Sequence, residues 1–407
     1  MASKKARESS LLAPYVSFTV LSATADFLFG AIFVTILLGR GVDPWLLGLA
    51  LGAGNLVSLL IEAPSGALGD RFGHRRLMVV GLALWGAGFA LFGLADGLVA
   101  TFSGMCLWAI GFPLQSGTLT ALVVNRIGSH SRAERISRTV RFGQVAGNSG
   151  AVLGAASVMV AGTWWPADTL VMAGGVLLVA LALLAPVCFP SSPGRPGRRL
   201  TAIIRDSARL VAGRRFLPLV ALTASLTAGT SLLVVSWQPM LLTAHGEDVR
   251  LNGVTLLAMT SSLALGAVCA RFVDRGRRPH TWAPVCAAFV GLPLVLTAHG
   301  LLPLALGLVA AEFLIGLTGV LSGVWQQLMF TDADRNTMFS MLGMVAGLVR
   351  ALLLVSFGGL WGSLGLTWAV TVMSAVGVVT AVSAGVLARV LPESTRFTQT
   401  AGARTRT

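Results

Sequence analysis

Four charged residues lie inside long apolar stretches of this 407-residue sequence. Asp26, Glu312 and Arg350 stand near the middle of their stretches, and Glu62 stands toward the end of another. A charged side chain at the centre of a bilayer costs about 2.5–3.5 kcal/mol or more, so such a residue needs a partner or a function. The chemistry to consider is proton exchange, binding of a charged substrate, or ion pairing inside a membrane.

Two interpretations are open for the charges near mid-membrane. Glu312 and Arg350 have opposite charge and similar depth in neighbouring stretches, which allows either a structural ion pair or a pair that binds substrate or rearranges during transport. Asp26 has no basic residue at its depth in the first half of the chain. Because a buried carboxyl group can hold and release a proton, Asp26 is either a proton or cationic-substrate site or a hydrogen-bonded structural acid.

The apolar stretches that carry these residues have the length of membrane-spanning helices. The sequence is 55% hydrophobic and only 11% charged, too few charges to cover the surface of a soluble protein. Runs of about 20 apolar residues, enough to cross a bilayer, recur along the chain. They predict an all-α integral membrane protein with twelve spans: Ala13–Leu38, Trp45–Leu68, Leu77–Ala95, Leu98–Leu122, Phe142–Gly162, Thr169–Phe189, Phe216–Leu242, Leu251–Ala270, Thr281–Thr297, Leu301–Trp325, Met338–Leu360 and Leu366–Leu391.

The net charge of +14 is explained by membrane topology rather than by nucleic-acid binding, because the basic residues are distributed unevenly between the loops. Basic residues gather in the loops on the side of the N-terminus, for example Arg71–Arg76 and Arg126–Arg138, whereas the opposite loops contain only Arg40 and Arg250. Cytoplasmic loops of membrane proteins carry this excess of Arg and Lys. We therefore predict that both termini are cytoplasmic, that membrane lipids are partners and that nucleic acid is not.

A segment rich in Pro, Gly and Arg divides the spans six and six. It predicts an N-terminal six-helix bundle over 1–189, a cytoplasmic linker over 190–215 and a C-terminal bundle with a short cytoplasmic tail over 216–407. Within the linker, Thr201–Leu210 has the pattern of a basic amphipathic helix. Val145-Ala146-Gly147 in the fifth span recurs as Val345-Ala346-Gly347 in the eleventh, which supports two pseudo-symmetric halves.

The most specific motif lies between the second and third spans. It reads Gly66-Ala67-Leu68-Gly69-Asp70-Arg71-Phe72-Gly73-His74-Arg75-Arg76. It resembles the signature loop of the major facilitator superfamily (MFS), G-x-L-x-D-R-x-G-R-[KR]-[KR], with His74 where the family prefers Arg. The resemblance implies two six-helix bundles around a central cavity that opens alternately to either side.

The same resemblance assigns an inner gate to this motif. Its glycines would let the second span approach a neighbouring helix closely, and Asp70 would face the N-terminus of a helix from the other half. Its arginines would pair with acids or lipid phosphates. The residues of this gate and signature loop are Glu62, Gly66, Asp70, Arg71, Gly73, Arg75 and Arg76.

Three further segments resemble bacterial facilitators that export drugs. They are Glu62–Gly66, similar to the lead-in E-x-P-[TS]-G; Gly111–Ala121, similar to the fourth span; and Gly143–Gly150, similar to the antiporter glycine motif. Asn148 replaces the proline of that last motif. Leu107 stands where many of these antiporters have an arginine, and Asn125 where they often have an acid.

Polar and aromatic residues at similar depth are candidates to line a substrate cavity. Each amide could equally make a hydrogen bond between helices, and each aromatic ring could equally be a packing residue. The candidates are Asn55, Trp108, Phe112, Gln115, Asn148, Trp237 and Gln238.

Several chemistries are disfavoured by what the sequence lacks. No lysine follows Lys5, so no phosphate-binding G-x-x-x-x-G-K-[ST] loop exists. No H-E-x-x-H or G-x-S-x-G motif is present, and the four cysteines have no metal-ligand spacing. We therefore expect no enzyme activity, no cofactor and no metal.

The function that we expect is proton-coupled efflux of a small hydrophobic drug or secondary metabolite. The protein would act by alternating access, as a monomer, in a bacterial cell membrane. The alternatives are a proton-coupled importer of a small nutrient and a facilitator-like receptor or scaffold that transports nothing. A membrane enzyme is a further alternative.

Overall fold

The computed structural model describes residues 2–94, 97–124, 132–191, 213–273, 278–329 and 335–391. Every regular element in these ranges is a helix. The first half contains α1 (Ala2–Gly30), α2 (Phe33–Gly39), α3 (Pro44–Phe72), α4 (His74–Leu94), α5 (Leu98–Val124), α6 (Arg132–Ala161) and α7 (Ala167–Cys188). The second contains η1 (Arg214–Phe216), α9 (Leu217–His245), α10 (Val249–Val273), α11 (Pro279–Phe289), α12 (Leu292–Ala298), α13 (Leu304–Met329), α14 (Arg335–Leu364) and α15 (Leu366–Val390).

The prediction of twelve membrane spans is confirmed. Within the described ranges, 12 helical segments are long and apolar enough to cross a membrane, and their ends lie close to the predicted ones. The cytoplasmic location of the termini stays a prediction. The predicted amphipathic helix Thr201–Leu210 lies outside the described residues.

Two spans that the sequence predicts as continuous are interrupted. In the first span, α1 ends at Gly30 and α2 begins at Phe33, and the Ile32 N–H bonds to the Phe29 carbonyl, one residue closer than in an α-helix. In the ninth span, α11 ends at Phe289 and α12 begins at Leu292. Pro293 explains this second break, because a proline ring clashes with the carbonyl four residues earlier, here that of Phe289.

The structure divides into two compact units. Unit 1 consists of Met1–Leu200 with Leu241–Ala258, and unit 2 consists of Thr201–Met240 with Met259–Thr407. The short segment in unit 1 includes the start of α10, where the Asn252 Nδ2 donates to the Ala31 carbonyl and to Thr35 Oγ1, each over 3.0 Å. Ala31 lies in the break between α1 and α2, so this break is contacted by a buried amide.

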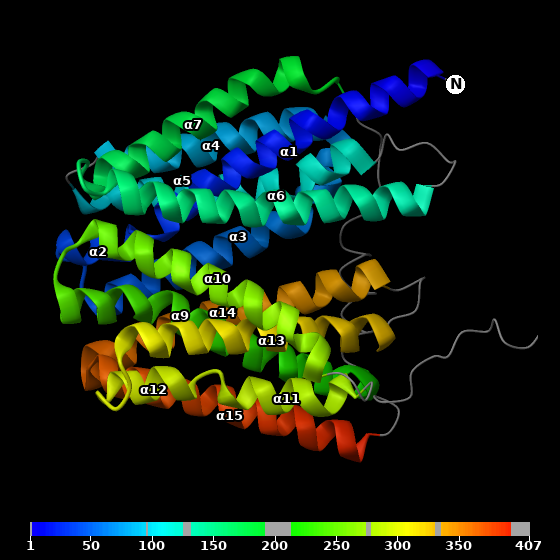
Figure 1. The fold of residues 1–407 in the computed structure, drawn as a ribbon. Coiled ribbons are helices and arrows are strands. Elements are labelled where there is room, and N and C mark those ends of the chain that lie inside the picture. The colour runs from blue at the N-terminus through cyan, green and yellow to red at the C-terminus, as the bar shows by residue number, and fades with distance from the viewer. Residues whose placement is uncertain are drawn as a thin grey trace, which may run out of the picture. The chain divides into compact units, whose positions relative to one another are not determined.

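Glycines allow the helices of unit 1 to pack with their backbones close together. Helix α4 lies between α5 and α7 (Figure 1). A Cβ atom on Gly88 would lie 2.6 Å from the Gly104 carbonyl oxygen of α5, and one on Gly86 would lie 2.7 Å from the Gly175 carbonyl oxygen of α7. Small residues at such contacts are the usual basis of helix association in a membrane, where apolar lipid provides no hydrophobic drive.

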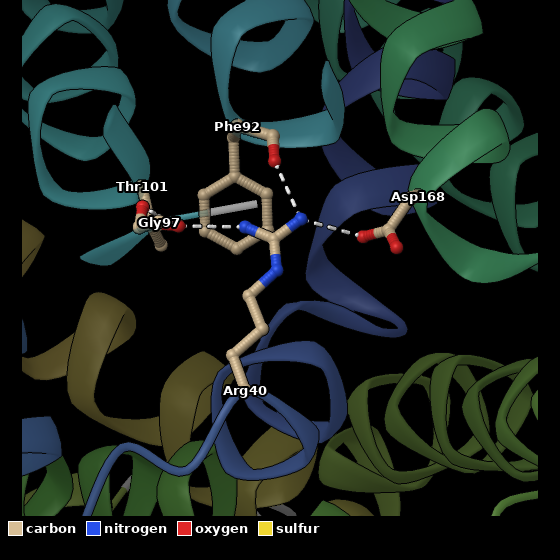
Figure 2. Close-up of polar contacts among 5 residues, drawn as sticks. All are labelled: Arg40, Phe92, Gly97, Thr101 and Asp168. Atoms are coloured by element: carbon tan, nitrogen blue, oxygen red, sulfur yellow. Dashed lines mark hydrogen bonds and ion pairs between the residues drawn. The ribbon is translucent and has the colours of Figure 1, made fainter. Parts of the chain in front are cut away.

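Arg40 joins four helices at the end of unit 1 opposite the N-terminus. It follows α2, and its guanidinium donates to Thr101 Oγ1 of α5 (2.7 Å), to the Phe92 carbonyl of α4 (2.8 Å) and to Asp168 Oδ1 of α7 (2.8 Å) (Figure 2). Its carbon Cζ also lies 5.0 Å from the centre of the Phe92 ring. The side chain of Arg40 is only 16% exposed, so this ion pair is partly shielded from water.

We predict that Gly86→Ala lowers the stability of the protein by about 1–3 kcal/mol, because the added methyl group overpacks the contact between α4 and α7. The matched control is Gly54→Ala on α3, where the nearest atom to the added methyl would be Ala109 Cβ at 4.0 Å. Gly54→Ala should be neutral or stabilising, since alanine is the better helix former. Thermal unfolding of both variants in detergent tests this; equal melting temperatures would contradict the packing.

We also predict that Arg40→Met lowers the free energy of unfolding by about 1.5–3 kcal/mol, because hydrogen bonds to a charged group are lost while the aliphatic stem is kept. Arg250→Met is the control: Arg250 is exposed, and its side chain bonds to no described residue. A double-mutant cycle with Asp168→Asn, read from thermal unfolding, should give a coupling of at least about 0.5 kcal/mol. Strict additivity would mean that the ion pair contributes nothing.

Candidate functional site

A cavity of about 530 Å³ lies in unit 1 and is lined by one face of α1. This face carries Tyr15, Thr19, Ser22 and Asp26. The spacing of four, three and four residues places all of them on the same side of a helix. The volume is within the range of sites that hold drug-sized ligands.

Three other helices complete the walls of this cavity. Helix α4 contributes Trp85, and α5 contributes Phe112, Gln115 and further residues at helical spacing. The Trp85 and Phe112 rings meet edge to face, with centres 5.1 Å apart, and form an aromatic wall. Helix α6 contributes Gly143, Gln144 and Gly147, and no atom lies within 4 Å of where a Gly147 Cβ would be.

Three polar groups of residues that line the cavity have no hydrogen-bond partner among the described residues, and one of them is the buried Nε1 of Trp85. The Asp26 carboxyl group makes no hydrogen bond or ion pair with any residue in the described ranges. The side-chain amide of Gln115, a residue only 6% exposed, likewise bonds to none of the residues that the structure describes. Polar groups in an apolar surrounding are costly unless satisfied, so the Asp26 carboxyl group and the Gln115 amide are candidates to contact water, a proton or a ligand.

The glycines of α6 position that helix against α1. The Tyr15 ring occupies the space in which a Gly143 side chain would lie, and its hydroxyl is 3.4 Å from Thr120 Oγ1 of α5. Further along, a Cβ atom on Gly154 would lie 2.7 Å from the Thr24 carbonyl oxygen. Gly143 of the glycine motif and Gly154 beyond it therefore bring α6 against the helix that carries Asp26.

The signature motif is helical almost throughout, rather than an extended loop. Helix α3 continues to Phe72, α4 begins at His74, and the turn is the single residue Gly73, whose φ is 91°. Glycine adopts this backbone conformation without the penalty that other residues carry. Gly69 faces the His74 ring, 2.5 Å from where its Cβ would be, so the motif also needs a glycine there.

Arg75 binds the end of α7. Its Nη1 donates to the carbonyls of Pro186 (3.2 Å) and Phe189 (3.1 Å). The Pro186 carbonyl cannot receive the usual helical bond from residue 190, because that residue is a proline without an N–H. Arg75 therefore satisfies backbone carbonyls at a helix C-terminus, and its predicted pairing with acids or lipid phosphates stays a prediction.

The rest of the predicted gate is exposed or not described in detail. Glu62, Arg71 and Arg76 are exposed, and the Arg71 guanidinium lies 5.4 Å from the centre of the Phe72 ring. The side chain of Asp70 and the surroundings of Gly66 lie outside what the structure describes. The gating role of these residues stays a prediction.

The predicted ion pair between Glu312 and Arg350 is not formed in this structure. Glu312 is half-buried on α13 and makes no ion pair or hydrogen bond with any described residue, whereas Arg350 is exposed on α14. Similar depth in neighbouring spans does not fix how each helix is rotated about its axis, and rotation decides whether two side chains meet. A part for either residue in coupling stays a prediction.

The other cavity candidates fall into three groups. Phe112 and Gln115 line the cavity, and Asn148 accepts a hydrogen bond from the lining residue Gln144 (3.3 Å). Trp108 packs in an aromatic cluster, with its ring centre 5.1 Å from that of Phe29. The remaining three are Asn55, half-buried on α3, and Trp237 and Gln238, both buried in α9 of unit 2.

Sequence reasoning missed Tyr15, Trp85 and the polar stripe that ends at Asp26. Tyr15, Thr19, Ser22 and Asp26 recur at helical spacing within one apolar run, a signal that the sequence contains. Trp85 carried no such signal, because its contacts are with residues distant in sequence. The Arg40 cluster was also missed, since Arg40 was considered only as a loop charge.

Comparison with known proteins gives relatives that match a limited part of the chain. The multidrug resistance protein MdtH of Yersinia enterocolitica is 34% identical over 119 residues, which is 29% of this chain and 28% of that protein. MdtH of Yersinia pestis is 33% identical over 117 residues, 29% of this chain and 27% of the relative. The matched region thus spans less than a third of the length of these relatives.

Solved structures share the fold over nearly the whole chain. A bacterial homologue of the human lysosomal transporter Spinster has a TM-score of 0.75 at 15% identity, covering 95% of this chain and 98% of the other. The peptide-transporter-family protein PepTSo has a TM-score of 0.72 at 12% identity, with coverage of 95% and 98%. At these identities the likeness concerns the fold alone.

The family model described as Major Facilitator Superfamily matches residues 16–329, which is most of the chain. This match agrees with the motif Gly66–Arg76 and with the twelve apolar helices. The chain therefore belongs to the major facilitator superfamily and is a multi-pass transporter of the kind found in bacterial cell membranes.

Proposed function

We propose that this protein exports a small hydrophobic compound from the cell in exchange for protons. The observation that carries the proposal is the Asp26 carboxyl group, which bonds to no described residue and lines a drug-sized cavity with an aromatic wall. The relatives named as multidrug resistance proteins support the same substrate class. Nutrient import remains the alternative with the same fold.

The walls of the cavity suit a compound that is largely apolar. Phe112, which is 37% exposed, offers a ring surface with the buried Trp85 ring packed against it, and Ala23 adds aliphatic surface. Aromatic rings bind flat apolar groups and, through their electron-rich faces, cations. The Gln115 amide supplies a single hydrogen-bonding group nearby, which orients a ligand without requiring it to be polar.

Exchange follows if the proton and the substrate compete for Asp26 and its surroundings. When the cavity faces outward, the carboxyl group takes up a proton and the substrate leaves. When the cavity faces inward, an arriving substrate displaces that proton into the cytoplasm. One substrate moves out and one proton moves in, so the proton gradient drives export.

The test is proton movement in inverted membrane vesicles that are energised by respiration and given a panel of hydrophobic antibiotics and dyes. We predict that a substrate triggers proton release from vesicles with the protein and that Asp26→Asn reduces this release to the level of vesicles without it. Asp43→Asn is the matched control, because Asp43 caps α3 at the chain's exposed surface and asparagine caps a helix equally well.

Several outcomes separate the alternatives. Full coupled transport by Asp26→Asn would remove Asp26 from the mechanism. Loss of transport for cationic substrates alone, with neutral ones still coupled to protons, would make Asp26 a substrate ligand rather than the proton site. Accumulation of a compound in right-side-out vesicles under an inward proton gradient would establish import instead of efflux.

A further inference from the structure

A second hollow, unrelated to the Asp26 cavity, lies in unit 2 between α11 and α15. It is a groove of about 540 Å³, and the two helices that form it pack side by side (Figure 1). Its walls are apolar and exposed, with Val285 and Phe289 on α11 and Val382 and Val386 on α15. Exposed apolar side chains on membrane-spanning helices are surrounded by acyl chains, so lipid is the natural occupant.

The groove is deep at Gly385, because glycine has no side chain to fill the space there. Gly385 of α15 lies opposite Pro284 of α11, and a Cβ atom on Gly385 would be 3.6 Å from Pro284 Cβ. Any side chain larger than alanine would therefore fill the space between the two helices. Gly385 leaves room for a chain of methylene groups to lie between them.

One end of the groove is basic. His280 and Thr281 of the first turn of α11 and Arg389 of the last turn of α15 line it there, and Arg278, the exposed residue that precedes α11, lies beside them in sequence. Arg389 makes no hydrogen bond or ion pair with any residue in the described ranges, and no acidic residue is among those that line the groove. Its positive charge is thus available to an anion.

The length of the groove fits one leaflet of a membrane. From His280 to Phe289 the helix rises by about 13 Å, close to half of the roughly 30 Å hydrocarbon core. The basic end therefore lies at headgroup level when the apolar end lies near the membrane centre. Arginines at this level contribute binding energy toward anionic lipids.

We propose that this groove is a binding site for an anionic phospholipid. The phosphate group lies against Arg389 and Arg278, and one acyl chain occupies the space beneath, over Gly385 and between the valines. By the predicted topology the lipid belongs to the cytoplasmic leaflet. The site is independent of the transported compound, since it shares no residue with the Asp26 cavity.

The experiment compares phosphatidylglycerol and phosphatidylcholine with identical acyl chains, each titrated onto the purified full-length protein in detergent and followed by native mass spectrometry. The protein should bind phosphatidylglycerol about five-fold or more tightly, and Arg389→Gln should lower that affinity about five-fold while leaving phosphatidylcholine unchanged. Arg271→Gln, which removes an exposed arginine that lies over Phe272 outside the groove, should change neither.

Two further variations keep the proposal falsifiable. Gly385→Leu should weaken both lipids because it fills the groove, and an unchanged melting temperature for Arg389→Gln shows that the variant is folded. Equal affinity for the two lipids in the original protein would overturn the proposal, as would an equal effect of Arg271→Gln and Arg389→Gln. Full displacement of phosphatidylglycerol by inorganic phosphate would also overturn it, because the site would then bind an anion without needing the acyl chain.

Discussion

The structure depends on one constraint, that a polar group inside a bilayer finds no water and must be satisfied by the protein. Helix α7 illustrates how the chain meets it. At its first turn, Asp168 pairs with Arg40, and at its last, the carbonyls of Pro186 and Phe189 accept bonds from Arg75. Both ends of this span are therefore fixed by arginines that come from other helices of unit 1.

In the middle of the spans, glycine contacts let helices pack together without polar side chains, so no additional polar group has to be satisfied there. Two helices can approach closely without polar side chains when each presents a bare backbone, as Gly88 and Gly104 do. The arginine contacts at the helix ends and the glycine contacts between them hold the helices of unit 1 in one arrangement. A bundle that rocks as a whole needs such internal contacts, because a soft bundle would deform instead of moving.

Much of the fold could be predicted because membrane insertion is a local property. Hydropathy locates each span from its own residues, and the excess of arginine in alternate loops gives a topology, so twelve helices followed from the sequence. The break at Phe289 was also foreseeable from Pro293, since the proline rule is local. The break after Gly30 was not, because the residues that make it are also common inside helices.

The site was predictable only in part, because it depends on helix rotation and on contacts distant in sequence. Asp26 drew attention as a charge in an apolar run, and its face of α1 could have been read from Tyr15, Thr19 and Ser22 at helical spacing. Glu312 and Arg350 drew attention for the same reason, yet Glu312 is half-buried, Arg350 is exposed, and the two form no ion pair with each other. Depth can be read from a sequence, whereas the rotation of a helix about its axis depends on its packed neighbours, so a sequence does not decide which side chains meet.

Not every polar group in the described part of unit 1 is satisfied, since the buried Nε1 atoms of Trp85 and Trp108 have no hydrogen-bond partner. The Asp26 carboxyl group and the Gln115 side-chain amide also bond to no described residue. Both face one drug-sized space beside an aromatic wall. By contrast, the Ala31 carbonyl in the broken first span does accept a hydrogen bond from a side chain, the amide of Asn252. A carboxyl group that no described residue contacts is costly inside a membrane, and this cost is the physical reason for our proposal that Asp26 exchanges protons.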